Sequence, residues 1–395
     1  MSSHPKGWLF FKIEGVFIMY KMFNREKKSE ILFIIILLIA NILLLLIPNN
    51  YQKDNDTYTY TVGKVISVDN SEVGQYGIIR QGEQYAEIEV LRGERKGEIF
   101  ETNNQLIGKM ELDKFLKAGD TVYVEMFDAR GRTYLNVVDF YRLGTEGILF
   151  GIFVIILIIY AGWTGIKTVL SFSTSLLMIW KVMIPLFLQG YDPVFLAFWI
   201  VLALTAVVIF LVGGFEKKGI VAFLGAGSGV LITLILSQLF SDPFVINGSV
   251  MPFSETLLNS GFANLNLNKL FLASVFIGSS GAVMDIGMDL SAAMKEIVDK
   301  HPKITVKELT ISGLNIGRAV VGTMSTTLLF AYAGGYLTLL MAFMAQGVNA
   351  GAMLNLNYFS SEIFKTIIGS FGLVLTAPFT AIIGAIIYKL PSKQK

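Results

Sequence analysis

The chain has 395 residues, of which 53% are apolar and only 16% charged, with a formal net charge of +2 and no cysteine. Soluble domains usually carry about 25% charged residues, so this composition excludes an ordinary soluble protein. The lack of cysteine excludes disulfides, zinc-thiolate sites and cysteine nucleophiles. Apolar windows of about 20 residues recur and are long enough to cross a bilayer, so they predict a polytopic membrane protein.

The N-terminal elements are a polar tail and a first apolar segment. Residues 31–48, ILFIIILLIANILLLLIP, follow the predicted cytoplasmic tail at 1–30. The segment is longer than the apolar region of an ordinary cleaved signal peptide, and no small-residue cleavage site follows it. We therefore expect a transmembrane signal anchor at 31–48.

The next region, 49–145, has a different pattern. Short runs rich in β-branched and aromatic residues alternate with polar ones, which is typical of strands. Glycines between the runs indicate turns. Five short strands in one region favour a small all-β domain, either an OB-like barrel or a sandwich. The five predicted strands are 58–68, 84–93, 97–104, 120–127 and 133–142.

The region 146–390 returns to long apolar windows, and hydropathy predicts a multi-span helical membrane domain there. The apolar segment 334–347 is too short to cross the bilayer comfortably, so we interpret it as re-entrant or interfacial. A short tail is expected at 391–395. The predicted fold class is an all-α membrane bundle of about eight transmembrane helices plus the small all-β domain. The predicted spans are 31–48, 147–163, 168–188, 194–214, 219–240, 268–287, 311–333 and 363–388.

Lysine and arginine set the predicted orientation, because cytoplasmic loops carry an excess of these residues. Basic residues cluster before the first span, at 217–218, at 295–307 and at the C-terminus. The loops 189–193 and 241–267 contain no lysine or arginine. Eight spans put every basic cluster in the cytoplasm, and a ninth would put the last cluster outside. We expect a multi-pass cell-membrane protein with both termini cytoplasmic and the β-rich region extracytoplasmic.

Two carboxylates, Asp285 and Asp289, lie at the end of the sixth predicted span. Ionisable groups in membrane segments are costly and usually face a cavity or a partner. Residues four apart share one helix face, so the two acids point together. The next span carries Arg318, with Asn315 one turn before it, and antiparallel pairing of the two spans would bring the acids to Arg318. An acid beside Arg318 would stay ionised and leave the other free to exchange a proton.

A structural interpretation stays open beside the functional one. Asp285 and Arg318 could form a pair that only holds two helices together, and Asp289 could lie beyond the hydrocarbon on a solvated helix. Gly313 and Gly317 have the small-xxx-small spacing that lets another helix approach closely. The run GAGSG at 225–229 lacks the preceding strand and the lysine of a phosphate loop, so we interpret it as a helix-packing surface.

Two runs resemble the YibE/F family of bacterial membrane proteins: GAVMDIGMDLSAAMKEI at 281–297 and SGLNIGRAVVGTMSTTLLFAYAGGYLTLL at 312–340. The order of an anchor, a β-rich region and a multi-span block is also similar, and the resemblance covers most of 58–388. Two positions depart from the family pattern. An acid commonly follows the arginine where this chain has Ala319, and an asparagine is common where it has Thr326. The resemblance implies an integral membrane protein of bacteria and no established activity.

Three functions remain open on the sequence alone. The polar cluster of Asp285, Asp289, Asn315 and Arg318 favours a transporter or permease. The alternative is a non-transporting anchor or signalling protein whose β-domain docks an extracytoplasmic partner. An intramembrane aspartyl protease is disfavoured, because its two acids must face each other, whereas these lie on one helix. We therefore expect no enzyme activity. Further binding or transport candidates are Ser279 and Ser280.

The expected partners are the lipid bilayer and either a small solute or an extracytoplasmic protein, with a second copy of the chain as a further option. His4 and His301 are too few for a catalytic metal, and we expect no metal or cofactor. Basic residues lie at loop edges, where they act as topology determinants, so nucleic-acid binding is not expected.

Overall fold

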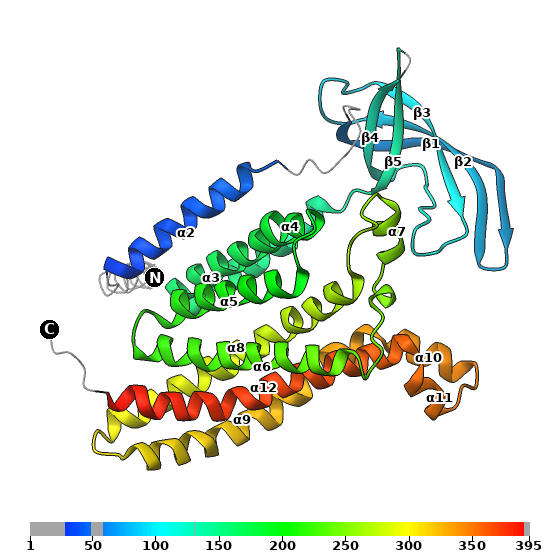
Figure 1. The fold of residues 1–395 in the computed structure, drawn as a ribbon. Helices are drawn as coiled ribbons and strands as arrows, with labels where there is room; N and C mark the ends of the chain where they lie inside the picture. Colours follow the sequence, from blue (N-terminus) through cyan, green and yellow to red (C-terminus); the bar gives the residue numbers. More distant parts are fainter. Residues whose placement is uncertain (1–27, 49–57, 130, 391–395) are drawn as a thin grey trace, which may run out of the picture. The chain divides into compact units, whose positions relative to one another are not determined.

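The computed structural model describes residues 28–48, 58–129 and 131–390, and Figure 1 shows its elements. The chain divides into two compact units, Met1–Pro48 with Leu157–Lys395, and Asn49–Ile156. We call the first the helical unit and the second the sheet unit. The predicted tail 391–395 and residues 1–27 of the predicted N-terminal tail lie outside the described residues.

The sheet unit contains one five-stranded sheet with the order β3-β2-β1-β4-β5, and every neighbouring pair is antiparallel. The edge strands β3 and β5 also meet, because the Thr102 hydroxyl donates to the Leu135 carbonyl at 2.5 Å. The sheet therefore curls into a barrel-like form, which is one of the two forms, barrel or sandwich, that the strand pattern left open. The strands are β1 Thr59–Tyr76, β2 Ile79–Val90, β3 Ile99–Ile107, β4 Thr121–Ala129 and β5 Arg132–Phe140.

The first hairpin is longer than the sequence predicts. The first predicted strand ends at residue 68, but β1 pairs with β2 as far as Tyr76 opposite Ile79. The ladder shifts register between Asp69 and Glu72, and this polar stretch lacks the alternation that marks strands. The hairpin turns at Gly77, where a φ of 64° favours glycine.

The core of the sheet unit is mainly apolar, but it also holds the buried amides of Gln84 and Asn104. Val65, Ile88 and Val124 are almost fully buried in it. Gln84 is also fully buried, and its amide nitrogen donates to Asn70 and to the Leu116 carbonyl. Its amide oxygen accepts from Asn104 and from the Leu116 N–H, so the side chain is fully hydrogen-bonded.

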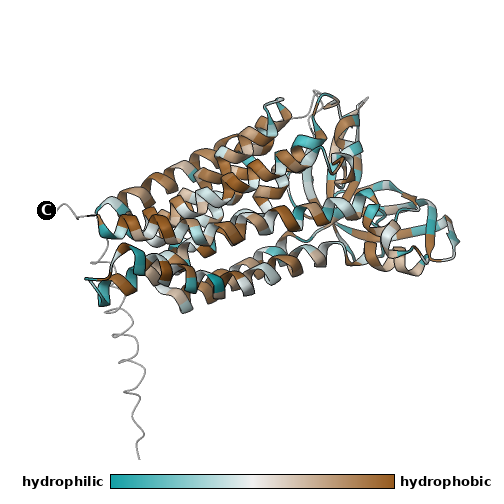
Figure 2. Ribbon diagram, turned by 60° about the horizontal axis from the view of Figure 1, so that its bottom comes forward, coloured by the Kyte–Doolittle hydropathy of each residue, from teal (hydrophilic) through white to brown (hydrophobic). Residues whose placement is uncertain are grey.

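The helical unit contains long apolar helices, and Figure 2 shows hydrophobic residues over much of their length. Within the described residues, six helical stretches are long and apolar enough to cross a membrane, or seven if the bent pair α9 and α10 counts as one. The helix α3 Leu143–Leu177 begins in the sheet unit and enters the helical unit at Leu157. The other helices are α2 Lys28–Leu46, η1 Met178–Met183, α4 Ile184–Leu188, α5 Pro193–Gly213, α6 Lys217–Ser241, η2 Gly248–Val250, α7 Ser254–Asn259, α8 Leu267–Lys300, α9 Val306–Gly335, α10 Leu337–Ala345, α11 Ala350–Asn355 and α12 Asn357–Lys389.

The helical stretch Leu143–Leu188 is 46 residues long and contains a sharp break at Gly162, with φ 57° and ψ −127°. A Cβ added to Gly165 would lie 2.6 Å from the carbonyl oxygen of Leu157. In a straight helix, residues eight apart would be separated by about 12 Å along the axis. The chain therefore reverses at Gly162, near the end of the predicted span 147–163.

The predicted short segment at 334–347 corresponds to a bend followed by a short helix. α9 ends at Gly335, and α10 follows at an angle of 60° to it. The nine residues of α10 extend for only about 14 Å, less than half of a hydrocarbon core. Its interpretation as re-entrant or interfacial stays a prediction.

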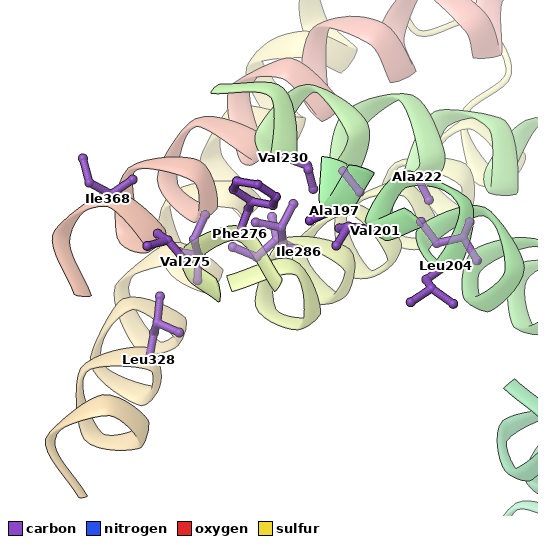
Figure 3. Close-up of a cluster of buried hydrophobic side chains, with 14 of the residues drawn as sticks. Ala197, Val201, Leu204, Ala222, Val230, Val275, Phe276, Ile286, Leu328 and Ile368 are labelled. Carbon is purple, nitrogen blue, oxygen red and sulfur yellow. The ribbon is translucent and has the colours of Figure 1, made fainter. Parts of the chain in front are cut away.

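The core of the helical unit joins α5, α6, α8, α9 and α12 (Figure 3). Close approach of α6 to α12 depends on glycine, since a Cβ on Gly225 would lie 2.0 Å from the Thr380 hydroxyl. A Cβ on Gly229 would lie 1.9 Å from the Thr376 hydroxyl. The interpretation of 225–229 as a helix-packing surface is therefore confirmed.

The first described helix, α2, packs on the second half of α3 through polar contacts and through the apolar pair Leu37 and Leu170. Glu30 and Lys167 form a 3.1 Å ion pair whose side chains are 18% and 8% exposed. The Asn41 amide donates to the Thr174 hydroxyl at 3.0 Å. Near the other end of α2, the Lys181 ammonium donates to the Ile47 carbonyl. These contacts make α2 a packed part of the helical unit.

Candidate functional site

Two of the four acidic residues of α8, Asp285 and Asp289, lie on one narrow exposed strip. Asp285 and Asp289 are exposed, and so are Gly278 and Gly281 on the same side. Between Phe271 and Met294 the other residues of α8 are buried or half-buried, because α5, α6, α9 and α12 all pack against it. We call these four residues the acidic stripe. The predicted common orientation of the two acids therefore holds.

The packing of α9 shows which of its residues lie against α8. A Cβ on Gly313 would lie 2.9 Å from Met294 Sδ, and one on Gly317 would lie 3.6 Å from Leu290 Cδ2. The same glycines meet α12, since a Cβ on Gly317 would lie 3.0 Å from the Cβ of Ala377. Gly313 and Gly317 thus form a close helix contact, as their spacing predicts.

This packing fixes the level of Arg318. Gly317 contacts Leu290, and these two residues adjoin Arg318 and Asp289 in the sequence. Arg318 and Asp289 therefore lie at nearly the same level of the helical unit. Asp285 lies one helical turn further from the α8–α9 loop, about 6 Å along the axis.

Arg318 points away from the buried side of α9. Residues 309, 313 and 317 are buried, whereas Asn315, Arg318 and Gly322 are exposed. The Arg318 guanidinium donates to the Asn315 side-chain oxygen at 3.1 Å, and both residues are on the helix surface. Arg318 therefore shares an exposed α9 face with Asn315 and Gly322, which we call the basic face.

The structure does not bring Arg318 onto the acids. Within the described parts of the chain, none of the ion pairs includes Asp285, Asp289 or Arg318. The acids and the arginine therefore lie on neighbouring helices at neighbouring levels without an ion pair between them in the described residues. The structural-pair interpretation, in which Asp285 and Arg318 hold the two helices together, is not what the helices show.

The two serines predicted as further candidates do not join this group. Ser279 is almost fully buried, and a Cβ on Gly369 of α12 would lie 3.2 Å from its Cβ. Ser279 and Ser280 donate to carbonyls of Phe276 and Ile277 on their own helix, at 3.5 Å and 2.7 Å. Ser279 thus packs towards α12, away from the acidic stripe.

The exposed charges are expensive if lipid covers them. A charged side chain at the centre of a membrane helix costs about 3 kcal/mol on insertion scales. Asp285 lies about 22 Å from Lys300 along α8, well inside a helix about 51 Å long. The acidic stripe and the basic face therefore require water or a polar partner around them.

A second polar group, on α12, was not predicted. Glu362 and Lys365 form a 2.8 Å ion pair that is less than one-quarter exposed on each side. The Lys365 ammonium lies 5.0 Å from the centre of the Phe271 ring of α8. Among the described residues, the buried hydroxyls of Tyr332 and Ser361 have no hydrogen-bond partner. The predicted span began at residue 363 and so left out Glu362, the partner of Lys365 three residues later. The i,i+3 spacing of these opposite charges was the sequence signal that could have identified the pair.

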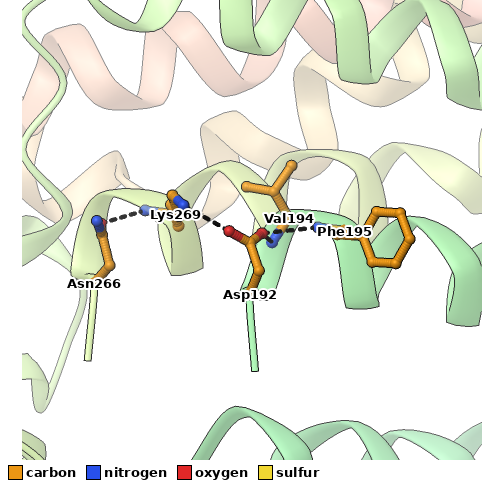
Figure 4. A network of polar contacts seen from close by, with 5 residues as sticks. All are labelled: Asp192, Val194, Phe195, Asn266 and Lys269. Atoms are coloured by element: carbon orange, nitrogen blue, oxygen red, sulfur yellow. Dashed lines mark hydrogen bonds and ion pairs between the residues drawn. The ribbon is translucent and has the colours of Figure 1, made fainter. Parts of the chain in front are cut away.

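Polar contacts also join the starts of α5 and α8 (Figure 4). Asp192 caps α5 by accepting from the N–H groups of Val194 and Phe195, and its other oxygen meets the Lys269 ammonium at 2.5 Å. Asn266 caps α8 by accepting from the Lys269 N–H. Partial burial raises the pKa of Asp192, but Lys269 and the two N–H groups outweigh it, so the pKa is lower than usual.

Comparison with known proteins gives a consistent result. The family described as YibE/F-like protein matches residues 149–390, and the YibE/F family N-terminal domain matches residues 56–139. These matches confirm the family that the two sequence runs resemble. No curated protein and no solved structure matches the chain. Together with the apolar helices, the family match indicates a multi-pass membrane protein.

Proposed function

The chain belongs to the YibE/F family, and from this premise we propose that it is a membrane transporter that uses the acidic stripe and the basic face. The observation that carries the proposal is the exposure of Asp285, Asp289 and Arg318 on two apolar helices, without an ion pair among the described residues. Such groups in membrane helices usually line solute or ion pathways. Asp285 is the acid that exchanges a proton, because it is one turn from the level of Arg318.

The orientation proposed for this transporter follows from basic residues at one end of the helical unit. The Lys389 ammonium donates to the Pro302 carbonyl, and Lys217 donates to the Leu390 carbonyl. These contacts gather the α5–α6 loop, the α8–α9 loop and the end of α12. A Cβ on Gly214, in the α5–α6 loop, would lie 3.1 Å from Glu30 near the start of α2. This grouping supports cytoplasmic termini, and the sheet unit would then be extracytoplasmic.

The proposed transporter has eight spans. The reversal at Gly162 supports the division of Leu143–Leu188 into two spans, because 46 residues extend for about 69 Å when straight. The 60° bend between α9 and α10 supports a single crossing by α9, with α10 staying on the side that α9 reaches.

The proposal is tested in proteoliposomes with a membrane potential and a pH-sensitive dye inside. We expect a solute-dependent proton flux from the wild-type protein when a panel of small solutes is supplied. Asp285→Asn should abolish this flux with unchanged protein incorporation. The matched control is Glu296→Gln on the same helix, whose carboxylate is exposed and pairs with Lys300. This control should keep the flux.

A second assay needs no known solute. Dicyclohexylcarbodiimide modifies protonated carboxyl groups in membrane segments, and mass spectrometry locates the modified residue. We expect modification at Asp285 that falls as pH rises. If Asp285 is never modified and Asp285→Asn keeps a wild-type flux, the transport proposal is wrong.

One observation favours the alternative of partner docking by the sheet unit. Aromatic rings stack across its surface, with the Tyr60 and Tyr123 centroids 5.8 Å apart and Phe127 and Tyr134 5.5 Å apart. Tyr60, Phe127 and Arg92 line a surface hollow of about 430 Å³. Exposed aromatic and arginine side chains are enriched at protein interfaces. Replacing Tyr60 and Tyr134 by alanine should then lower capture of a partner and leave proton flux unchanged.

A further inference from the structure

The basic face of α9 needs a partner from outside the chain's own described helices. Its buried side already packs against α8 and α12 through Gly317, and Arg318 lies about 100° around the helix from Gly317, on the exposed surface. A Cβ on Gly322 of this face, or on Gly281 of the acidic stripe, would have no atom within 4 Å. Both surfaces therefore have open space beside them, which water or another helix can occupy.

The two surfaces also border one another. The Tyr332 hydroxyl of α9 would lie 2.7 Å from a Cβ on Gly278, so the acidic stripe runs along the flank of α9. The α8 side of this joint surface carries two carboxylates, and the α9 side carries a guanidinium and the Asn315 amide. The joint surface is thus acidic on one half and basic on the other.

Such a surface is complementary to a second copy of itself. In a two-fold dimer the same patch is used by both partners, so residue i contacts j and j contacts i. A two-fold axis along the membrane normal keeps every residue at its own depth. Because Asp289 and Arg318 share a level, this axis would bring Asp289 of each copy opposite Arg318 of the other.

We propose that two copies of this chain assemble through the α8–α9 surface, with Asp289 of each copy paired to Arg318 of the other. The pairing neutralises charges that would otherwise meet lipid, and an ion pair shielded from water is worth more than an exposed one. α8 and α9 run in opposite directions, so each interhelical contact across the axis is antiparallel.

The dimer deepens the proposed transport function and uses the same surface, but it is tested separately. Asp289 becomes an interface residue that stays ionised beside Arg318 of the other copy. Asp285, one turn away, remains available for proton exchange. The transport site is then complete only in the dimer, because its arginine comes from the second copy.

The decisive experiment exchanges the charges between two differently tagged full-length copies in one membrane. In a dimer of Asp289→Lys alone, the new lysine would face Arg318 of the other copy, and two positive charges would repel. In a dimer of Arg318→Glu alone, the new glutamate would face Asp289 of the other copy, so self-association of each variant should weaken at least tenfold. When the two variants are co-expressed, both contacts of the mixed dimer become opposite in charge. We expect co-purification of the two tags to return to near the wild-type level.

An ion pair within one chain gives a different result. Each variant would then carry its own mismatched pair, and co-expression would restore nothing. That outcome would overturn the proposal, as would wild-type copies that never co-purify from lipid nanodiscs or mild detergent. Proton flux through a monomer would support the transport proposal and would contradict the dimer proposal.

A crosslinking measurement covers the case in which the charge variants fail to fold. The chain has no native cysteine, so Asp289→Cys in one tagged copy and Arg318→Cys in the other introduce the only thiols. A short bifunctional thiol reagent should join the two tags in native membranes. The control replaces Arg318→Cys by Ile235→Cys on the exposed side of α6, and no mixed product is expected. Equal crosslinking in both pairs would contradict the proposed interface.

Discussion

Asp289 on α8 and Arg318 on α9 lie at the same level of the helical unit, yet no ion pair joins them in the described structure. Their neighbours Leu290 and Gly317 are in contact, while the two charged side chains lie on exposed surfaces. In a membrane this arrangement is stable only if water or a polar partner reaches the charges. The proposals for transport and for dimerisation both start from this relationship.

The glycine contact between α6 and α12 predicts a stability change. Gly229→Ala should destabilise the protein by about 1–3 kcal/mol, because the new methyl group would meet the Thr376 hydroxyl and force the helices apart. Gly227→Ala is the matched control on the same helix, where the nearest atom is the flexible end of Leu202 at 3.3 Å. Thermal unfolding in detergent, monitored by size-exclusion chromatography, should give a lower melting temperature for Gly229→Ala than for Gly227→Ala. Equal melting temperatures would contradict the packing described.

The buried pair between α2 and α3 predicts an asymmetric mutant cycle. Lys167→Met should cost about 3 kcal/mol, since it leaves the Glu30 carboxylate without the Lys167 ammonium at a largely buried position. Adding Glu30→Gln should recover part of this loss. The measurement is the melting temperature of the two single variants and the double variant. Additive losses would mean that the two side chains do not act as a pair.

The ion pair between Asp192, the cap of α5, and Lys269 of α8 predicts a pH-dependent stability. The pKa of Asp192 is lower than its ordinary 3.8, so the stabilisation by its charge is present at neutral pH and is lost as pH falls through the lowered pKa. Asp192→Asn keeps an oxygen for the helix cap and removes the ion pair with Lys269. Both side chains are more than 40% exposed, so the expected loss is only about 0.5 kcal/mol.

The same variant supplies its own control through pH. The difference in melting temperature between wild type and Asp192→Asn should be largest near neutral pH and should vanish in acid below the lowered pKa. A difference that persists unchanged in strong acid would show that the carboxylate charge is not its cause.

The sequence predicted the apolar helices and the strands well because both depend on local composition. Windows of apolar residues found α5 and α6 within one or two residues at each end. Alternation found all five strands but missed the extension of β1 to Tyr76, where polar residues pair without a buried side. Hydropathy and alternation report burial, and they are silent where a strand is exposed on both faces.

The charged contacts were harder to predict because they depend on where each helix turns. Lys167 was expected between two spans, but the chain reverses earlier, at Gly162, and so Lys167 lies inside the second half of α3 opposite Glu30. Arg318 follows Gly317 by one residue, or about 100° around the helix. Once Gly317 packs inwards against α12, Arg318 points elsewhere, and sequence spacing alone does not say which neighbour α9 meets.

The central claim is that the part of the acidic stripe around Gly281 and Asp285, beyond the proposed Asp289–Arg318 pairs, faces water within the membrane, and thiol labelling tests it most directly. Gly281→Cys puts a single thiol on the stripe and leaves both acids intact, because the native chain has no cysteine. Ile235→Cys, on the exposed apolar side of α6, is the lipid-facing control. We predict that a membrane-impermeant thiol reagent labels Gly281→Cys rapidly and Ile235→Cys hardly at all. Equal and slow labelling of both would contradict the account, because the stripe would then lie in lipid or in a dry interface.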